Sequence, residues 1–346
     1  MSRFKLFTPL LWLLALLLAA WIFAQLPLAT ITQTIAALSW FQLVYWLGLN
    51  LVIILLCNRR WQLLNNVFGM YPGFGRLLLI RQAGQAVSFI TPGPQFGGEP
   101  LQIYWLYRLC NLPLGKTILA LGLDRFLELW INFSVLLLGL LIVLVYSAQE
   151  LTGWPELIGV LLLLVALMFA MLWVLLRQPL WLGKKLQVLA QRWHQHPRLL
   201  LLESGFQAMG EQLRTAVRTQ KAGLLQALLL SLVSWAMLLL DLWLVLRFAG
   251  INADLSAFLL VLVSMRLSML LPLPGGIGTL EAALLWSLHS LGHPASAALG
   301  VIALMRMRDA LVLGGSLWCL RLVQLRYKDT SNTKDSHLLT DGVLPG

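Results

Sequence analysis

The sequence Leu271-Pro-Leu-Pro-Gly-Gly-Ile-Gly278 interrupts an apolar stretch that runs from residue 255 to residue 291. A similar interruption, Thr91-Pro-Gly-Pro-Gln-Phe-Gly-Gly98, lies in the apolar stretch 77–110. Proline removes a backbone donor and ends a helix, and neighbouring glycines favour irregular backbone. We therefore predict that each stretch forms two short helices joined at a break, instead of one continuous helix.

The composition places these stretches in a membrane protein. Hydrophobic residues make up 59% of the 346 residues and charged residues only 11%, whereas a soluble domain carries about 25% charged residues. A helix needs about 20 apolar residues to cross a bilayer. Besides the two broken stretches, six segments approach or exceed this length, namely 6–26, 38–57, 117–146, 156–176, 223–249 and 296–320. We predict an all-α polytopic membrane helix bundle with about six full spans and two re-entrant broken helices.

The distribution of Lys and Arg predicts which loops face the cytoplasm. Both termini and the loop 177–222 are basic, whereas residues 27–37 and 147–155 carry no Lys or Arg. Basic residues flank both ends of the first broken stretch, which should therefore enter and leave on the inside; they are Arg59, Arg60, Arg76, Arg108 and Lys116. No Lys or Arg lies in the loops 250–254 and 292–294, so the second broken stretch should enter and leave on the outside. An alternative with two more full crossings would leave Arg108 and Lys116 outside.

This topology gives residues 38–146 and 223–320 the same order of elements in opposite orientation. Such an inverted-topology repeat is common among secondary transporters, and Pro92 and Pro272 occupy matching places 180 residues apart. We predict one integral membrane domain over residues 1–328. The loop 177–222 should form a basic amphipathic helix on the inner leaflet, and residues 329–346 a disordered cytoplasmic tail.

Backbone that is not helical cannot face lipid, so each break should be buried in protein or line a cavity. Helix N-termini that meet there favour an anion such as a phosphate or a carboxylate. Charged side chains inside spans cost about 2.5–3.5 kcal/mol each on insertion scales. They either form structural salt bridges or serve a ligand. On the second hypothesis, four arginines (Arg125, Arg266, Arg306 and Arg308) bind a lipid phosphate, and Glu99 and Glu281 carry protons or act as gates.

The candidate substrate-binding residues come from the two breaks and from the charges in the spans. They are Thr91, Pro92, Gly93, Gly97, Gly98, Glu99, Asp124, Arg125, Arg266, Pro274, Gly275, Gly276, Gly278, Glu281, Arg306 and Arg308.

No pattern points to catalysis, a metal or a cofactor. Cys57, Cys110 and Cys319 are far apart, and His194 and His196 have no partner at metal-ligand spacing. The net charge of +11 is explained by basic cytoplasmic loops, and no nucleic-acid-binding motif is present. We expect a multi-pass protein of the bacterial cytoplasmic membrane with both termini inside. Its partners should be anionic lipids, and a second copy or a cytoplasmic protein could bind at loop 177–222.

The two breaks also carry a family resemblance. Gly97-Gly-Glu-Pro100 after Thr91-Pro-Gly93, and Leu271–Gly278 followed by Glu281, resemble the two signatures of the flippase-like membrane domain of the lysylphosphatidylglycerol synthase family. The resemblance covers about residues 8–325. Pro94-Gln-Phe96 departs from the first signature, where the family more often has another run of glycines. Members that make lysylphosphatidylglycerol carry a soluble synthase domain after the membrane part. We therefore expect only the membrane module here, without aminoacyl transfer.

The resemblance implies that the protein moves a phospholipid, a glycolipid or an isoprenoid-linked lipid between leaflets. Together with the intramembrane arginines, it predicts a lipid translocase that is not an enzyme. Two alternatives are a scaffold or regulator of lipid or envelope synthesis that docks through loop 177–222, and a membrane-embedded lipid-modifying enzyme.

Overall fold

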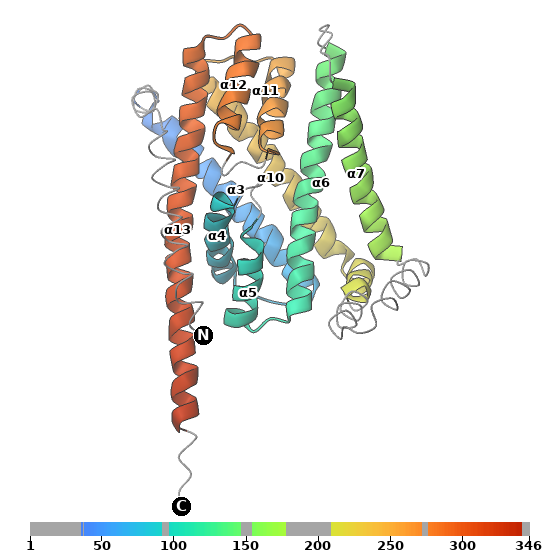
Figure 1. Ribbon diagram of the computed structural model, residues 1–346, viewed down its shortest axis with the longest axis vertical. Helices are drawn as coiled ribbons and strands as arrows, with labels where there is room; N and C mark the ends of the chain where they lie inside the picture. Colours follow the sequence, from blue (N-terminus) through green and yellow to red (C-terminus); the bar gives the residue numbers. More distant parts are fainter. Residues whose placement is uncertain are drawn as a thin grey trace, which may run out of the picture. The chain divides into compact units, whose positions relative to one another are not determined.

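The computed structural model describes residues 36, 38–91, 97–146, 154–177, 209–271 and 276–340 (Figure 1). Every regular element in these ranges is a helix, which confirms the prediction of an all-α polytopic membrane protein. The chain divides into two compact units. Unit one contains residues 1–52, 73–111 and 239–346, and unit two contains residues 53–72 and 112–238.

Three helices in the described ranges are long and apolar enough to cross a membrane, judged by length and composition. These are α3 (Trp40–Val67), α10 (Lys221–Phe248) and the part of α6 (Leu114–Tyr146) that ends at Val143. They match the predicted spans 38–57, 117–146 and 223–249. The predicted span 156–176 is the helix α7 (Trp154–Arg177). The predicted first span, 6–26, lies outside the described residues.

Helix α3 runs ten residues beyond the end predicted at residue 57. Arg59 and Arg60, which the charge pattern assigned to a loop, therefore lie on a helix. No Gly or Pro occurs between residues 58 and 68, so nothing in the local chain ends the helix earlier. It ends where Gly69 adopts φ 71° and the amide of Met70 donates to the carbonyl of Asn65 at 3.0 Å.

Each broken stretch forms two short helices, as predicted. The first contains α4 (Phe74–Ile90) and α5 (Glu99–Cys110), with 17 and 12 residues. The second contains α11 (Leu255–Ser268) and α12 (Thr279–Ser290), with 14 and 12 residues. At about 1.5 Å per residue, all four are shorter than the hydrocarbon core of about 30 Å.

In unit one, helix α13 (Ala295–Thr340) packs along α4, and α11 lies beside α12 (Figure 1). Phe89 near the end of α4 and Ile277 just before α12 both pack against Leu313 of α13. The end of α4 and the start of α12 therefore meet on the same helix.

Helix α13 continues to Thr340, where the sequence predicted a disordered tail from residue 329. After Pro294 and the glycines at positions 300, 314 and 315, the next Pro or Gly in the sequence is Gly342. A helix that is already formed extends at little cost through residues without Pro or Gly. The predicted span 296–320 lies in α13, but Arg306, Arg308 and Asp309 interrupt its apolar composition.

In unit two, α6 lies beside α7 (Figure 1), and the rings of Trp130 and Phe169 meet edge to face with centroids 5.0 Å apart. Leu64, Leu127 and Ala227 form a buried cluster between α3, α6 and α10. Of the predicted amphipathic loop, the segment 209–222 is described, and all of it except Gln220 is helical. Leu213 packs from there against Val67 and Ala120, as does Ala216.

Several large apolar side chains on these helices remain exposed, including Leu163 and Leu167 on α7 and Leu229 on α10. Exposed apolar side chains of this kind are expected on a surface that faces lipid.

Candidate functional site

The second break is connected to a buried arginine of α13. Arg306 donates from Nε to Oε1 of Glu281 at 2.6 Å, and from Nη2 to the carbonyl oxygen of Gly276 at 3.2 Å. The other carboxylate oxygen of Glu281 accepts the amide of Gly278 at 2.8 Å. Glu281 thus caps the first turn of α12 and pairs with Arg306. The charges inside the spans were expected to form structural salt bridges or to serve a ligand, and Glu281 and Arg306 form a salt bridge in this structure.

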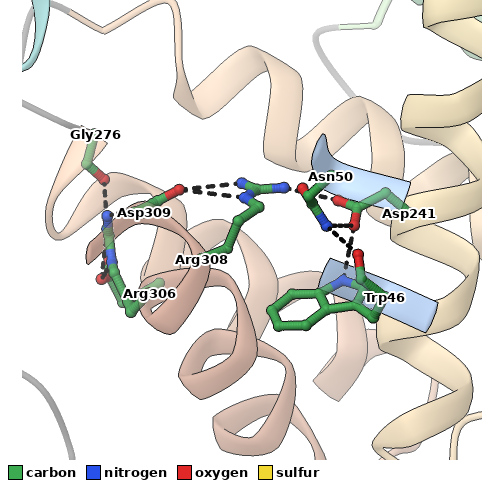
Figure 2. A network of polar contacts seen from close by, with 8 residues as sticks. Trp46, Asn50, Asp241, Gly276, Arg306, Arg308 and Asp309 are labelled. Atoms are coloured by element: carbon green, nitrogen blue, oxygen red, sulfur yellow. Dashed lines mark hydrogen bonds and ion pairs between the residues drawn. The ribbon is translucent and has the colours of Figure 1, made fainter. Parts of the chain in front are cut away.

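A polar network continues from Arg306 across unit one (Figure 2). Nη1 of Arg306 lies 3.3 Å from Oδ2 of Asp309, and Nη2 of Arg308 lies 3.2 Å from Oδ1 of the same carboxylate. Nη1 of Arg308 then lies 2.8 Å from Oδ2 of Asp241 on α10. One acid and one base thus alternate from the break to α10.

The network ends on α3, where two side chains donate to Asp241. Trp46 Nε1 lies 2.8 Å and Asn50 Nδ2 lies 2.9 Å from Oδ1 of this carboxylate (Figure 2). Trp46 and Asp241 are buried. We call these residues the α13 network: Trp46, Asn50, Asp241, Gly276, Glu281, Arg306, Arg308 and Asp309. Its carboxylates accept several charged or polar donors each, which offsets the cost of burying them.

At the first break, α4 and α5 approach each other closely at glycine residues. The amide of Gly98 donates to Ser88 Oγ at 3.0 Å, and the amide of Gly97 donates to Glu99 Oε2 at 2.7 Å. A Cβ at Gly98 would lie 2.1 Å from the carbonyl oxygen of Gly84, and a Cβ at Gly84 would lie 2.3 Å from the side chain of Gln102. Only glycine permits this approach of α4 and α5.

Unit two contains a second set of paired charges, of which Arg60 and Asp124 are buried. Arg60 Nε lies 2.6 Å from Asp124 Oδ1, and Arg60 Nη2 lies 3.1 Å from Glu128 Oε2. Arg125 pairs with Glu128 at 3.1 Å, and Arg60 also donates to Ser231 Oγ at 3.4 Å. These contacts join α3, α6 and α10 through their side chains.

The described site residues lie in four places. Gly276, Gly278, Glu281, Arg306 and Arg308 belong to the α13 network or adjoin it. Thr91, Gly97, Gly98 and Glu99 lie at the first break, and Arg266 lies in the last turn of α11, all in unit one. Asp124 and Arg125 lie in unit two. Pro92, Gly93, Pro274 and Gly275 lie outside the described residues. The role of these residues in ligand binding stays a prediction.

Sequence reasoning missed Trp46, Asn50 and the burial of Arg60. A signal for Arg60 was nevertheless present. Arg60 and Asp241 are 181 residues apart, and Glu128 and Arg308 are 180 apart, close to the spacing of the two breaks. In each predicted repeat, an ion pair joins the first long helix to the last. The ion pair is Arg60–Glu128 in the first repeat and Asp241–Arg308 in the second, so the basic and acidic positions are exchanged.

Among the described residues, no group of three or more His, Cys, Asp or Glu side chains could hold a metal ion.

Residues 10–314 match the family model described as "Lysylphosphatidylglycerol synthase TM region". A UPF0104 membrane protein from Methanothermobacter thermautotrophicus is 32% identical over 127 residues, which cover 36% of this chain and 35% of that protein. UPF0104 membrane protein MJ1595 from Methanocaldococcus jannaschii is 23% identical over 104 residues, which cover 30% of this chain and 31% of that protein. The alignments thus span about a third of each curated relative. No solved structure matches the chain. Since the family model covers most of its length, this membrane protein belongs to the family of the lysylphosphatidylglycerol synthase transmembrane region.

Proposed function

We propose that the protein is a lipid translocase that moves an anionic phospholipid or a lipid-linked anionic head group between leaflets. The observation that carries this proposal is the contact of buried Arg306 with both Gly276 and Glu281 at the second break. A guanidinium group that touches a backbone break inside an apolar protein is a suitable partner for a phosphate.

The head group would bind by exchange of partners. Arg306 and Arg308 are paired with Glu281, Asp309 and Asp241 in this structure. A phosphate that replaces one carboxylate keeps each guanidinium paired, so no charge has to be buried alone at any step. We infer that Glu281 is the carboxylate that gives way, because its side chain is 26% exposed while that of Asp241 is 3% exposed.

The short helices support an alternating-access mechanism. Half-length helices that meet near the middle of a bilayer are a feature of transporters built from inverted repeats. We propose that α4–α5 and α11–α12 are re-entrant pairs in one membrane domain, entered from opposite sides. Asp124 and Arg125 then stabilise the bundle through their pairs with Arg60 and Glu128. We further propose that the protein resides in a bacterial cytoplasmic membrane with both termini inside and has no catalytic activity of its own.

The first test is mass spectrometry of the lipids that stay bound to gently purified protein. Wild type would be compared with Arg306→Gln, Arg306→Lys and a matched control, Arg321→Gln, which changes an exposed arginine of the same helix. We expect one anionic lipid to be enriched in the wild type and the control, reduced in Arg306→Lys, and lost in Arg306→Gln. Thermal melting of each variant separates loss of lipid from loss of fold.

The enriched lipid would then be tested for transport in proteoliposomes. A fluorescent analogue in the inner leaflet becomes accessible to an impermeant quencher only if the protein moves it outward. The proposal is wrong if the wild type moves no anionic lipid faster than empty vesicles, or if folded Arg306→Gln moves it as fast as the wild type.

A further inference from the structure

The two broken stretches of unit one are fastened in different ways. On the first, Gly98 and Gly84 bring α5 and α4 into contact at distances that no side chain would allow. On the second, a Cβ at Gly278 would meet nothing within 4 Å, and a Cβ at Gly276 would meet two side chains, Met269 at 3.0 Å and Thr279 at 3.9 Å. The start of α12 therefore has room around its backbone that the first break lacks.

The first hairpin is also attached to α13 along its length. Phe89 packs against Leu313, Gln82 Oε1 accepts from Ser316 Oγ at 3.3 Å, and the hydroxyl groups of Tyr104 and Tyr327 lie 2.9 Å apart. Helix α4 packs more extensively along α13 than α12 does. Helix α4 is therefore packed along α13, and α5 is joined to these helices through its glycine contacts with α4 and through Tyr104.

Among the described contacts, the polar bonds from α13 to the start of α12 come from one side chain. Arg306 bonds both to the carbonyl oxygen of Gly276 and to Glu281 in the first turn of α12, and Ile277 adds a small apolar contact with Phe89 and Leu313. Gly276 and Gly278 have φ values of 61° and 86°, in the region that glycine enters freely. Arg306 can exchange its partners, whereas the glycine contacts of the first break cannot be exchanged.

We propose that the α11–α12 hairpin is the moving part of unit one, that α4–α5 stays fixed on α13, and that Arg306 holds the start of α12 in the position that this structure shows. Breaking the bonds of Arg306 to Gly276 and Glu281 releases the segment Gly276–Glu281 while the first hairpin keeps its contacts. This inference adds to the proposed function by naming the hairpin that moves. It rests on that function only in treating the movement as part of transport.

Hydrogen exchange of the full chain in lipid nanodiscs tests the inference without a transport assay. We expect Arg306→Gln to speed amide exchange in peptides covering residues 276–285 about tenfold or more, because charged hydrogen bonds that hold this segment are lost. Exchange in peptides covering residues 82–89 and 99–106 should stay within about twofold of the wild type, since local opening spares segments outside the released unit.

The matched control is Arg308→Gln. Arg308 lies two residues after Arg306 on α13 and forms two ion pairs, with Asp241 and Asp309, but neither partner belongs to α12. This variant should leave exchange over residues 276–285 close to that of the wild type. Glu281→Gln keeps Arg306 and its bond to Gly276. This variant should raise the rate of amide exchange over residues 276–285 by less than Arg306→Gln does.

Equal acceleration in both hairpins, or none over residues 276–285 in Arg306→Gln, would overturn the inference. The exchange measurement reports movement whether or not any lipid is carried. An inactive proteoliposome assay combined with selective exchange would therefore reject the translocase function and keep the moving hairpin.

Discussion

Arg60 and Asp124 are the most deeply buried ion pair in the described part of the chain, with side-chain exposures of 2% and 0%. Removing one partner leaves the other charge buried alone, which costs about 3–5 kcal/mol. We expect Asp124→Ala to lower the melting temperature of the purified protein by many degrees, measured by intrinsic fluorescence on heating. The exposed neighbour Arg59 is the matched position, and Arg59→Ala should change the melting temperature little.

The double variant Arg60→Met, Asp124→Leu distinguishes a missing partner from general damage. Apolar residues of similar volume often replace a buried ion pair without loss of stability. The double variant should therefore melt well above Asp124→Ala. If the double variant melts at a lower temperature than Asp124→Ala, the ion pair stabilises the protein by more than the neutralisation of one buried charge by the other.

At the level of residues, the sequence showed which charged residues lie inside the spans, but not which side chain each of them contacts. Glu281 and Arg306 were both expected among the charges of the spans, but which of these charges pair with each other was not predicted. Arg60 was assigned to a loop, since loop charges and buried charges look alike when the end of a helix is unknown. Trp46 and Asn50 gave no signal, because an apolar span hides which polar side chain faces another helix.

At the level of elements, Gly98 decides how closely α4 and α5 approach. Its backbone has φ −81° and ψ −15°, which alanine adopts easily, so Gly98→Ala tests sterics alone. The added methyl would lie 2.1 Å from the carbonyl oxygen of Gly84. We expect overpacking to cost about 1–3 kcal/mol or more, seen as a lower melting temperature and a smaller monodisperse fraction on gel filtration.

Gly122→Ala is the control for this change. Gly122 lies inside α6, and a Cβ there meets nothing within 4 Å. Alanine favours a helix by about 1 kcal/mol over glycine, so this variant should be as stable as the wild type or more so. A stable Gly98→Ala would mean that α4 and α5 can separate at little cost, which would weaken the case for a fixed first hairpin.

The existence of the helices could be predicted, while several of their ends could not. Apolar length located α3, α6, α7 and α10, and the Pro-Gly pattern located both breaks. The ends of α3 and α13 were placed too early, because polar residues after an apolar run signal the edge of a membrane without ending a helix. A helix ends where its backbone is interrupted, as at Gly69 with φ 71°.

At the level of the whole molecule, the predicted topology places both ends of the α4–α5 hairpin on the inside and both ends of α11–α12 on the outside. Two exposed prolines at the starts of long helices, Pro113 before α6 and Pro294 before α13, make a matched pair of reporter positions. With Cys57, Cys110 and Cys319 replaced by alanine, an impermeant maleimide should label Pro294→Cys in intact bacterial cells. It should label Pro113→Cys only after the membrane is opened. Labelling of both in intact cells would mean that the first hairpin crosses the membrane completely. The inverted repeat, and with it the alternating-access mechanism, would then have to be abandoned.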